Sequence, residues 1–503
     1  MVRKGVFVAF WLLFLVANLL ATDCRQVVIM HTTDLHGKFT DADSGQEFSW
    51  LRAATVIRQL RERYGDDQCL LVDCGDNTVG SLATVLTKGE AAMTAILEMK
   101  VDAWIPGNHE FDYGVDQFKR FVKLAGDRAI CGNLSVEGME PMQPWRIFQK
   151  NGVKIAVIGA TAAFTRHWLL GDEARQVQDV SAVIALRKIL PQVVEAKPDL
   201  IVLAIHQGWF EVPDKRGVNE VSEIAWAFPE IDLILGGHSH RTIAGRRIGH
   251  RTWYVQPGCH GKYVGVVTAK LDVENHKLIE IGSRILEIDQ TYQEDQALRD
   301  ALGDVLARAE AERNRVVVES LPKAISSYGR PGVGCGTSEL ICRAIGRFTG
   351  ADVVLHGRLS RKSLLAGPVA IGDLFELVPY ENRIVTAEIT LDDLQEIVAE
   401  QWRFKNHYSF SGLLGAILDV QKDGEWAKVV SLETMSLNSS RRIKLALNSH
   451  TAAGSGRFLK LREILDRPTS NTTILQTTTR DVLESFLRTD QSTLQPKTYY
   501  RTR

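Results

Sequence analysis

The sequence has few cysteines for its length, and its positive and negative charges almost cancel. Seven cysteines in 503 residues are too few to form a disulfide scaffold. Cys69 and Cys74 flank one predicted strand, which would hold them roughly 16 Å apart, beyond bridging distance. Lysine and arginine number 60 against 61 aspartate and glutamate residues. No overall charge therefore favours nucleic acid or a membrane surface as a partner.

Long apolar runs are missing after the first residues, where one such run lies. Arg3 and Lys4 precede an apolar stretch over residues 6–21, which is short for a spanning helix and typical of an export signal. We predict a signal peptide over residues 1–22 and a mature protein that is exported, either periplasmic or extracellular. An uncleaved membrane anchor is the alternative. The length and the 45% hydrophobic content suggest two or three globular domains.

Five apolar runs in the first half each end in a glycine-rich break that carries acid, amide or imidazole side chains. These breaks cover residues 33–37, 73–77, 106–114, 206–208 and 236–240. Ligands of open α/β sheets bind beyond the carboxyl ends of the strands, where loops converge on a rigid frame. Five of the 13 histidines fall in these loops. One such loop alone could be an ordinary polar turn, but five together indicate a single site.

The donor types of these loops indicate the chemistry of that site. Oxygen and nitrogen donors with no cysteine in ligand register favour zinc, manganese, iron or cobalt. There are too many donors for one tetrahedral ion, so two divalent metal ions are the economical interpretation. Two ions about 3.5–4 Å apart are typical of phosphoesterases. His109 and Asp112 are three residues apart, so one helical turn would let the carboxylate orient the ring.

These motifs resemble those of the calcineurin-like metallophosphoesterases, and more narrowly of the exported 5'-nucleotidase and 2',3'-cyclic-nucleotide phosphodiesterase family. The resemblance is carried by residues 34–37, 75–76, 107–112, 206 and 236–240, and by residues 256–258 and 261–265 further on. It implies an α/β fold in which a four-layer sandwich, two mixed sheets flanked by helices, carries the site. It also implies in-line attack on a phosphate ester by a metal-bound hydroxide.

The resemblance further implies a role for each residue of the site. His109, oriented by Asp112, would stabilise the phosphoryl transition state or protonate the leaving group. Thr33 stands where the family usually has asparagine, a departure that should be tolerable because the side chain is not a ligand. The implied metal ligands are Asp34, His36 and His240 for one ion, Asn108, His206 and His238 for the other, and Asp76 bridging both.

The domain organisation follows from a change of pattern after residue 288. We predict a metallophosphoesterase domain over residues 25–290, a linker helix within residues 291–320, and a C-terminal α/β domain of the 5'-nucleotidase type over residues 321–503 that recognises the substrate. Leu298, Leu302, Val305 and Leu306 have helical spacing, which supports the linker helix. A surface helix of the first domain is the alternative.

The C-terminal domain departs from the family at its binding residues. Gly357 and Arg361 stand where the family has them, but Arg358 and Leu359 replace glycines and would obstruct a close backbone approach. Phe458 fits the second of two aromatic residues that stack on the base, although aromatic residues are more often part of the core. We predict that Arg361 and Phe458 contact the substrate.

The sequence thus predicts an exported hydrolase acting on phosphoric ester bonds. Its simplest substrates would be phosphate monoesters such as 5'-nucleotides, or 2',3'-cyclic nucleotides. One alternative keeps the metal chemistry for a non-nucleotide phosphate or another oxyanion ester. A decayed metal-binding scaffold is a third, and the intact ligand set argues against it. The expected partner is a small phosphate ester, with no nucleic acid, and with the membrane only through an uncleaved signal anchor. Metal identity and oligomeric state stay open.

Overall fold

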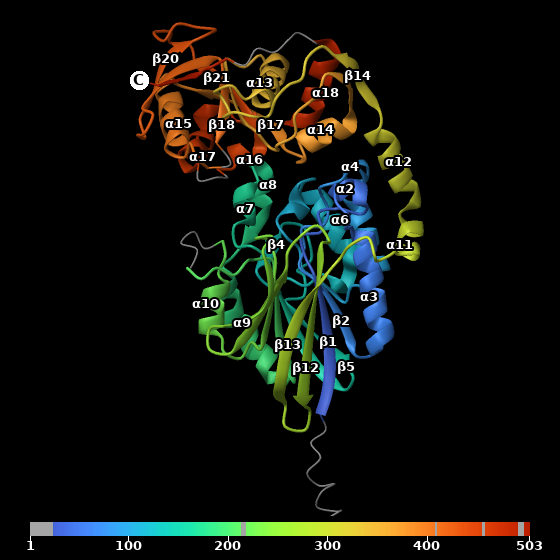
Figure 1. The fold of residues 1–503 in the computed structure, drawn as a ribbon. Coiled ribbons are helices and arrows are strands. Elements are labelled where there is room, and N and C mark those ends of the chain that lie inside the picture. Colours follow the sequence, from blue (N-terminus) through green and yellow to red (C-terminus); the bar gives the residue numbers. More distant parts are fainter. Residues whose placement is uncertain (1–23, 213–217, 408–409, 455–457, 491–496, 503) are drawn as a thin grey trace, which may run out of the picture.

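The computed structural model describes residues 24–212, 218–407, 410–454, 458–490 and 497–502. The predicted signal peptide, residues 1–22, lies outside the described residues and stays a prediction. The chain forms two domains, one above the other in Figure 1, with a helical linker along one side. None of the helices in the described part of the chain has both the length and the hydrophobicity needed to cross a bilayer.

The first domain is built on two mixed sheets. The first sheet has the order β13 (Lys277–Glu287), β12 (Tyr263–Asp272), β1 (Cys24–Thr32), β2 (Cys69–Asp73), β3 (Ala103–Trp104). The second has the order β10 (Thr242–Ile248), β11 (Thr252–Pro257), β9 (Leu233–Gly236), β8 (Leu200–Ile205), β6 (Val153–Ala160), β5 (Trp145–Lys150). Strands β1, β2 and β3 pair in parallel, as do β6, β8, β9 and β11, and the other pairings are antiparallel. The predicted sandwich of two mixed sheets is confirmed.

Apolar side chains fill the space between the two sheets, and helices cover their outer faces. Val27 and Ile29 of β1 are fully buried in the same cluster as Val202 of β8. Because successive side chains of a strand point to opposite faces, Val28 and Met30 pack in the outer cluster instead. The outer helices are α3 (Trp50–Tyr64), α5 (Glu90–Glu98) and α6 (Val115–Ala125) on the first sheet, and α9 (Ala182–Glu195) and α10 (Val221–Ala227) on the second.

Helix α3 shows how local sequence sets these outer elements. The Ser49 side chain accepts a hydrogen bond from the backbone N–H of Arg52 and so caps the first turn, which satisfies one amide that has no partner within the helix. Trp50, Ala54 and Ile57 recur at helical spacing and are buried. This spacing aligns one apolar face with the sheet.

The second domain is an α/β layer structure around a five-stranded sheet. The sheet has the order β18 (Ser411–Leu414), β15 (Val353–Gly357), β21 (Ile443–Asn448), β17 (Arg383–Ile389), β22 (Thr473–Thr478). Helices α13 (Gly336–Thr349), α14 (Ile371–Leu377) and α18 (Thr479–Thr489) pack on one face, and α15 (Leu391–Arg403) and α17 (Leu459–Leu465) on the other. A small sheet of β20 (Ala427–Leu432), β19 (Ala416–Val420) and β23 (Tyr500–Thr502) completes the domain.

The linker differs from the single helix predicted for it. It consists of α11 (Gln296–Ala301) and α12 (Gly303–Arg313), with a break at Leu302. The next strand, β14 (Val316–Leu321), pairs with β16 (Gly367–Ala370) and so belongs to the second domain. The predicted linker, residues 291–320, thus includes most of a strand that pairs within the second domain, and the predicted domain bounds stay a prediction.

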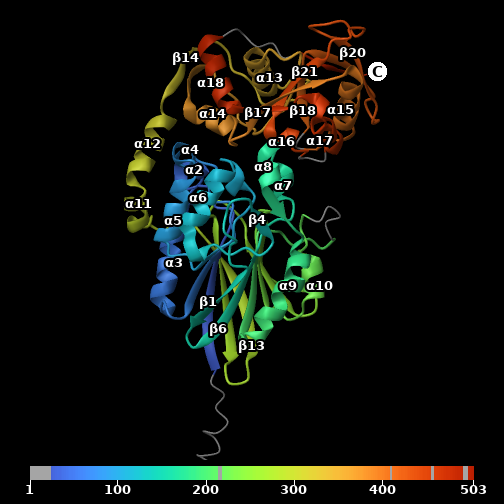
Figure 2. The ribbon, with the colours of Figure 1, turned by 180° about the vertical axis from the view of Figure 1, so that it is seen from behind.

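The second domain lies at one end of the sandwich (Figures 1 and 2), and ion pairs link the first domain to it and to the linker. Arg383, at the start of β17, pairs with Glu173 of α8 (Gly171–Gln176) at 2.5 Å. Arg313, the last residue of α12, pairs with Asp43 of α2 (Asp41–Ser44) at 2.6 Å. The first pair joins the two domains directly, and the second holds the end of the linker against the first domain.

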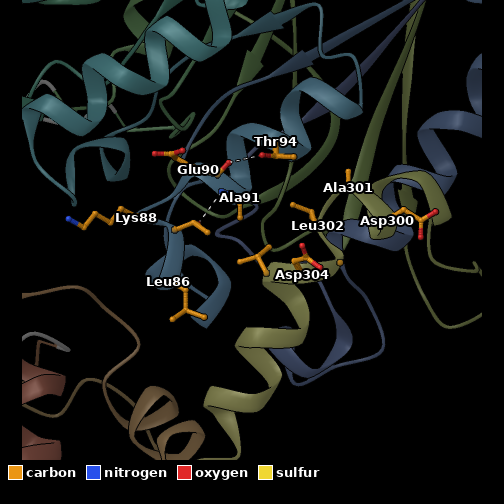
Figure 3. Close-up of a pocket in the computed structure, with 12 residues that line it drawn as sticks. Leu86, Lys88, Glu90, Ala91, Thr94, Asp300, Ala301, Leu302 and Asp304 are labelled. Carbon is orange, nitrogen blue, oxygen red and sulfur yellow. Dashed lines mark hydrogen bonds between the residues drawn. The ribbon is translucent and has the colours of Figure 1, made fainter.

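A pocket of about 620 Å³ lies where the linker meets the first domain (Figure 3). Leu86 of α4 (Leu82–Thr87) and Glu90 of α5 line one side, and Asp300 and Asp304 of the linker line the other. None of the residues that line this pocket is a predicted site residue. The chemistry predicted from the sequence therefore lies elsewhere.

Candidate metal centre

The five predicted loops meet at the edge of the sandwich that faces the second domain. Strand β1 runs toward that domain in Figure 1, and β2 and β3 are parallel to it. The loops at residues 33–37, 73–77 and 106–114 follow these three strands, and those at 206–208 and 236–240 follow β8 and β9. The structure therefore assembles residues that are about 200 positions apart in the sequence into one cluster.

Asp34 lies at the centre of a first group of donors. Its carboxylate is fully buried and accepts hydrogen bonds from the Thr33 hydroxyl at 2.7 Å and from the backbone N–H of His238. The His240 Nε2 atom lies 3.3 Å from Asp34 Oδ1 and 3.1 Å from His36 Nε2. The donor atoms of Asp34, His36 and Asp76 all lie within 4.8 Å of one another. These spacings suit ligands that share one cation.

A second group of donors contains Asp76, His206 and His238, whose donor atoms also lie within 4.8 Å of one another. His206 Nδ1 lies 2.5 Å from the Cys74 carbonyl oxygen, so this nitrogen donates a proton and Nε2 faces the group. A carbonyl partner of this kind fixes the tautomer of a metal-binding histidine. Asp76 belongs to both groups, which is the arrangement expected of a bridging ligand.

Two buried ligand atoms test whether these residues fit cations. Asn108 Oδ1 and His206 Nε2 have no hydrogen-bond partner within the part of the chain that the structure describes. His206 Nε2 lies 3.0 Å from Asp76 Oδ2, but without the alignment of a hydrogen bond. Buried polar atoms without partners are costly. A cation between the groups would satisfy both atoms, so the residues fit divalent metal ions.

His109 and Asp112 form a pair beside these groups. His109 begins a 3-10 turn, η1 (His109–Phe111), and Asp112 directly follows it, with His109 Nδ1 2.9 Å from Asp112 Oδ2. Burial lowers the pKa of His109, but the charges of Asp112 and Asp76 outweigh it and raise the pKa to about 10. In the metal-free protein, His109 is therefore protonated at neutral pH. It remains partly exposed, with 28% of its side-chain surface accessible, so it can donate a proton to a bound molecule.

Glu110 was not predicted, although it lies within the motif at residues 107–112. Its carboxylate is fully buried and accepts three backbone hydrogen bonds, from Gly107 at 2.6 Å, Asn77 at 2.7 Å and Asp76 at 2.9 Å. It therefore connects the loop after β2 to the loop after β3. Burial and the charge of Asp76 raise the pKa of Glu110 to about 7. The sequence offers no signal for this role because the three amides belong to two separate loops.

The space around Gly107 explains why the motif at residues 107–112 begins with a glycine. A Cβ atom at this position would lie 2.2 Å from Asp76 Oδ1, much closer than two such atoms can approach. Any side chain at position 107 would thus displace the carboxylate that both donor groups share.

His260 is a second residue that was not predicted. It follows β11, and its donor nitrogen lies within 4.8 Å of those of His36 and His240. Only the flanking residues 256–258 and 261–265 were recognised from the sequence, and the histidine between them has no counterpart in the motifs used.

The predicted substrate residues of the second domain are not brought together in the same way. Arg361 has an exposed side chain, and its role in binding stays a prediction. Phe458 has no exposed surface and packs in the core, with its ring 6.2 Å from that of Phe404. The ring is enclosed by core side chains, and the predicted role of Phe458 in stacking on a base stays a prediction. The Arg358 guanidinium donates to the carbonyls of Ser327 and Gly329 instead of facing solvent freely.

Comparison with known proteins gives a consistent result for both domains. Residues 27–242 match the family model of the calcineurin-like phosphoesterases, and residues 316–463 match the model of the 5'-nucleotidase C-terminal domain. Protein UshA of Yersinia enterocolitica is 24% identical over 495 residues and covers 86% of each chain. A 5'-nucleotidase of Vibrio cholerae is 25% identical over 496 residues, covering 87% of this chain and 86% of that protein.

Solved structures share the whole architecture. A putative 5'-nucleotidase from Staphylococcus aureus superposes with a TM-score of 0.82 at 20% identity, over 95% of this chain and all of that one. The sulfate thiohydrolase SoxB of Thermus thermophilus superposes with a TM-score of 0.65 at 15% identity, over 95% and 96% of the two chains. At these identities the likeness shows the fold.

The fold and the donor cluster define a metallophosphoesterase, a hydrolase that acts on phosphate esters. More narrowly, the chain belongs to the calcineurin-like phosphoesterases that carry a 5'-nucleotidase C-terminal domain.

Proposed function

We propose that this chain is an exported enzyme that uses two divalent metal ions to hydrolyse phosphate esters, most simply 5'-nucleotides or 2',3'-cyclic nucleotides. The observation that supports this most directly is the pair of donor groups that share Asp76. The printed names of the relatives, UshA and 5'-nucleotidase, are consistent with it. Zinc, manganese, iron and cobalt all suit the mixed nitrogen and oxygen donors.

The residues divide into those that would hold the ions and those that would act on the ester. One ion would be held by Asp34, His36, Asp76 and His240, and the other by Asp76, Asn108, His206 and His238. When bound, such ions neutralise charge on phosphate oxygens and lower the pKa of water.

His109 supplies the proton chemistry of the reaction. With Nδ1 bonded to Asp112, the proton on Nε2 of the imidazolium is free to pass to the leaving-group oxygen. Asp112 holds the ring orientation and keeps it charged. In the metal-free protein, the charges of Asp112 and Asp76 raise the pKa of His109 to about 10 although burial opposes it, and Asp112 would still favour the protonated ring when ions occupy the neighbouring groups.

A second candidate is a non-nucleotide phosphate or another oxyanion ester. Two observations support this second candidate: Phe458 is buried where a stacking ring is expected, and the Arg358 guanidinium donates hydrogen bonds to two backbone carbonyls outside its own loop. The same fold also occurs in SoxB, whose name, sulfate thiohydrolase, refers to a sulfur oxyanion and not to a nucleotide.

Product analysis separates these candidates, with release of phosphate measured for the monoesters and formation of 2'- or 3'-AMP measured for 2',3'-cyclic AMP. The purified protein is assayed with AMP, 2',3'-cyclic AMP, a sugar phosphate and 4-nitrophenyl phosphate, before and after chelation and metal return. We expect metal-dependent hydrolysis, with selectivity for AMP if the nucleotide proposal holds. Hydrolysis of the aryl ester alone would favour the second candidate. A preparation that contains two ions by elemental analysis and hydrolyses none of these esters would refute the proposal.

A further inference from the structure

His260 stands beside the first donor group from a loop that the metal-ligand motifs do not include. Its donor nitrogen lies within 4.8 Å of those of His36 and His240. The ring centroids lie 5.5 Å and 5.7 Å from these two rings, compared with 5.0 Å between His36 and His240 themselves. The three imidazoles therefore meet around a common centre, with His260 nearly as close as the other two.

The backbone at His260 has the same unusual conformation as the proposed ligands. A positive φ is uncommon outside glycine and indicates a position held by its surroundings. His260 has a φ of 63°. The proposed ligands in the same region of φ are Asp34 at 52°, His36 at 47°, Asp76 at 58°, His238 at 66° and His240 at 54°.

A backbone hydrogen bond ties His260 to the first donor group. The N–H of His260 donates to the carbonyl oxygen of Asp34 at 2.7 Å. Strand β11 pairs with β9, the strand that precedes His238 and His240. These two connections hold His260 close to Asp34, which follows a strand of the first sheet, and to His238 and His240, which follow a strand of the second.

The ring of His260 has no other evident task. Within the described part of the chain, neither of its ring nitrogens takes part in a hydrogen bond. The buried His31, by contrast, bonds to the carbonyl of Gly236 at 3.0 Å. A half-buried imidazole that faces two other imidazoles and lacks an acceptor is well suited to bind a cation.

We propose that His260 is an additional ligand of the ion held by Asp34, His36, Asp76 and His240. This inference rests on the proposed two-metal function and extends it. The first ion would then have three imidazole ligands, and the second only His206 and His238. Imidazole suits zinc and iron, whereas oxygen donors suit manganese and magnesium. The first position should therefore select a nitrogen-preferring ion more strongly than the second.

The test compares His260→Gly with His276→Gly in the full-length protein. Glycine adopts positive φ without strain, and His276 also has a positive φ, 50°. His276 pairs with Asp199, which precedes β8 and so lies at the opposite end of that strand from His206. Both variants therefore place glycine at a position with positive φ. They differ in that only His260→Gly removes a ring that faces the donor cluster.

Each protein is stripped with a chelator and titrated with Zn²⁺ in competition with a metal indicator. We expect the wild type and His276→Gly each to bind two ions, and each dissociation constant of His276→Gly to equal the corresponding constant of the wild type. In His260→Gly one of the two constants should rise by at least about tenfold, and the other should stay unchanged. Two unchanged constants in His260→Gly would overturn the proposal.

A crystal structure of the zinc-loaded wild type, with ions located by anomalous scattering, decides between a ligand and a neighbour. A His260 nitrogen at about 2.0–2.1 Å from one ion supports the proposal, and one that remains beyond bonding distance overturns it. Neither the zinc titration nor the crystal structure depends on hydrolytic activity. A wild type that binds two ions but hydrolyses no ester would refute the proposed function alone, whereas one that binds no ion would overturn both.

Discussion

Replacing Glu110 by glutamine should weaken both the first domain and its metal binding. The Glu110 carboxylate accepts the backbone N–H groups of Asp76 and Gly107 on Oε2 and that of Asn77 on Oε1. Glutamine keeps one acceptor oxygen, and its amide group must face at least one of these donors whichever way it turns. One buried N–H then loses its partner and meets another donor.

The cost can be estimated from these contacts. Above about pH 7, where the Glu110 carboxylate is charged, a hydrogen bond to it contributes about 1.5–3 kcal/mol, and a buried donor without a partner costs about 1–3 kcal/mol. The two contributions overlap, so the free energy of unfolding should fall by about 2–5 kcal/mol. Because Asp76 lies in one of the loops that Glu110 connects, metal affinity should also fall, by at least about tenfold.

Urea denaturation of the metal-free protein, followed by tryptophan fluorescence, measures the first effect, because Trp50 and Trp104 are buried in the first domain. The two domains need not unfold together, so the transition that reports these tryptophans is the one to compare. Metal titration measures the second effect. Glu137→Gln is the control, since Glu137 is exposed and should behave as wild type. A Glu110→Gln protein with unchanged urea midpoint and unchanged metal content would refute the reasoning.

Four further predictions concern the metal centre and the substrate loop. Asp76→Asn should lower metal content and remove nearly all turnover, and elemental analysis that finds two ions with normal turnover would contradict the bridging role. His109→Ala should keep both ions and lose roughly 10²–10⁴-fold in rate, with a smaller loss in Asp112→Ala; an emptied metal site would instead make His109 a ligand. Although burial opposes it, the neighbouring carboxylates raise the pKa of His109 from 6.5 to about 10, so its stabilising contribution in the metal-free protein is complete below about pH 6.5 and is lost as the pH rises toward 10. Urea midpoints of wild type and His109→Ala should thus converge at high pH, and a gap that widens would reverse the sign. Arg361→Ala should raise KM for the best nucleotide while leaving 4-nitrophenyl phosphate hydrolysis nearly unchanged, whereas equal losses on both would assign Arg361 to the fold.

The loops of the candidate site could be predicted because their signals are local. An apolar run followed by glycine, acid and imidazole marks a strand end in a few residues, and five such runs in order made the resemblance specific. The structure confirms the two mixed sheets and brings Asp34, Asp76, His206 and His240 to one edge. The ligand roles themselves stay predictions until metal binding is measured.

Other features depend on contacts between distant segments, which no local pattern encodes. Glu110 acts on two loops at once, and His260 reaches the donor cluster only because β11 pairs beside β9. Phe458 follows a glycine-rich break that resembles a binding loop, yet it is buried against Phe404.

The sequence by itself determined which side chains could do the chemistry, because residue type and strand-end position are short-range properties. Only the tertiary structure decided which neighbours each side chain would meet. Burial, pairing between strands and the geometry around a shared carboxylate such as Asp76 arise when segments far apart in the chain pack together.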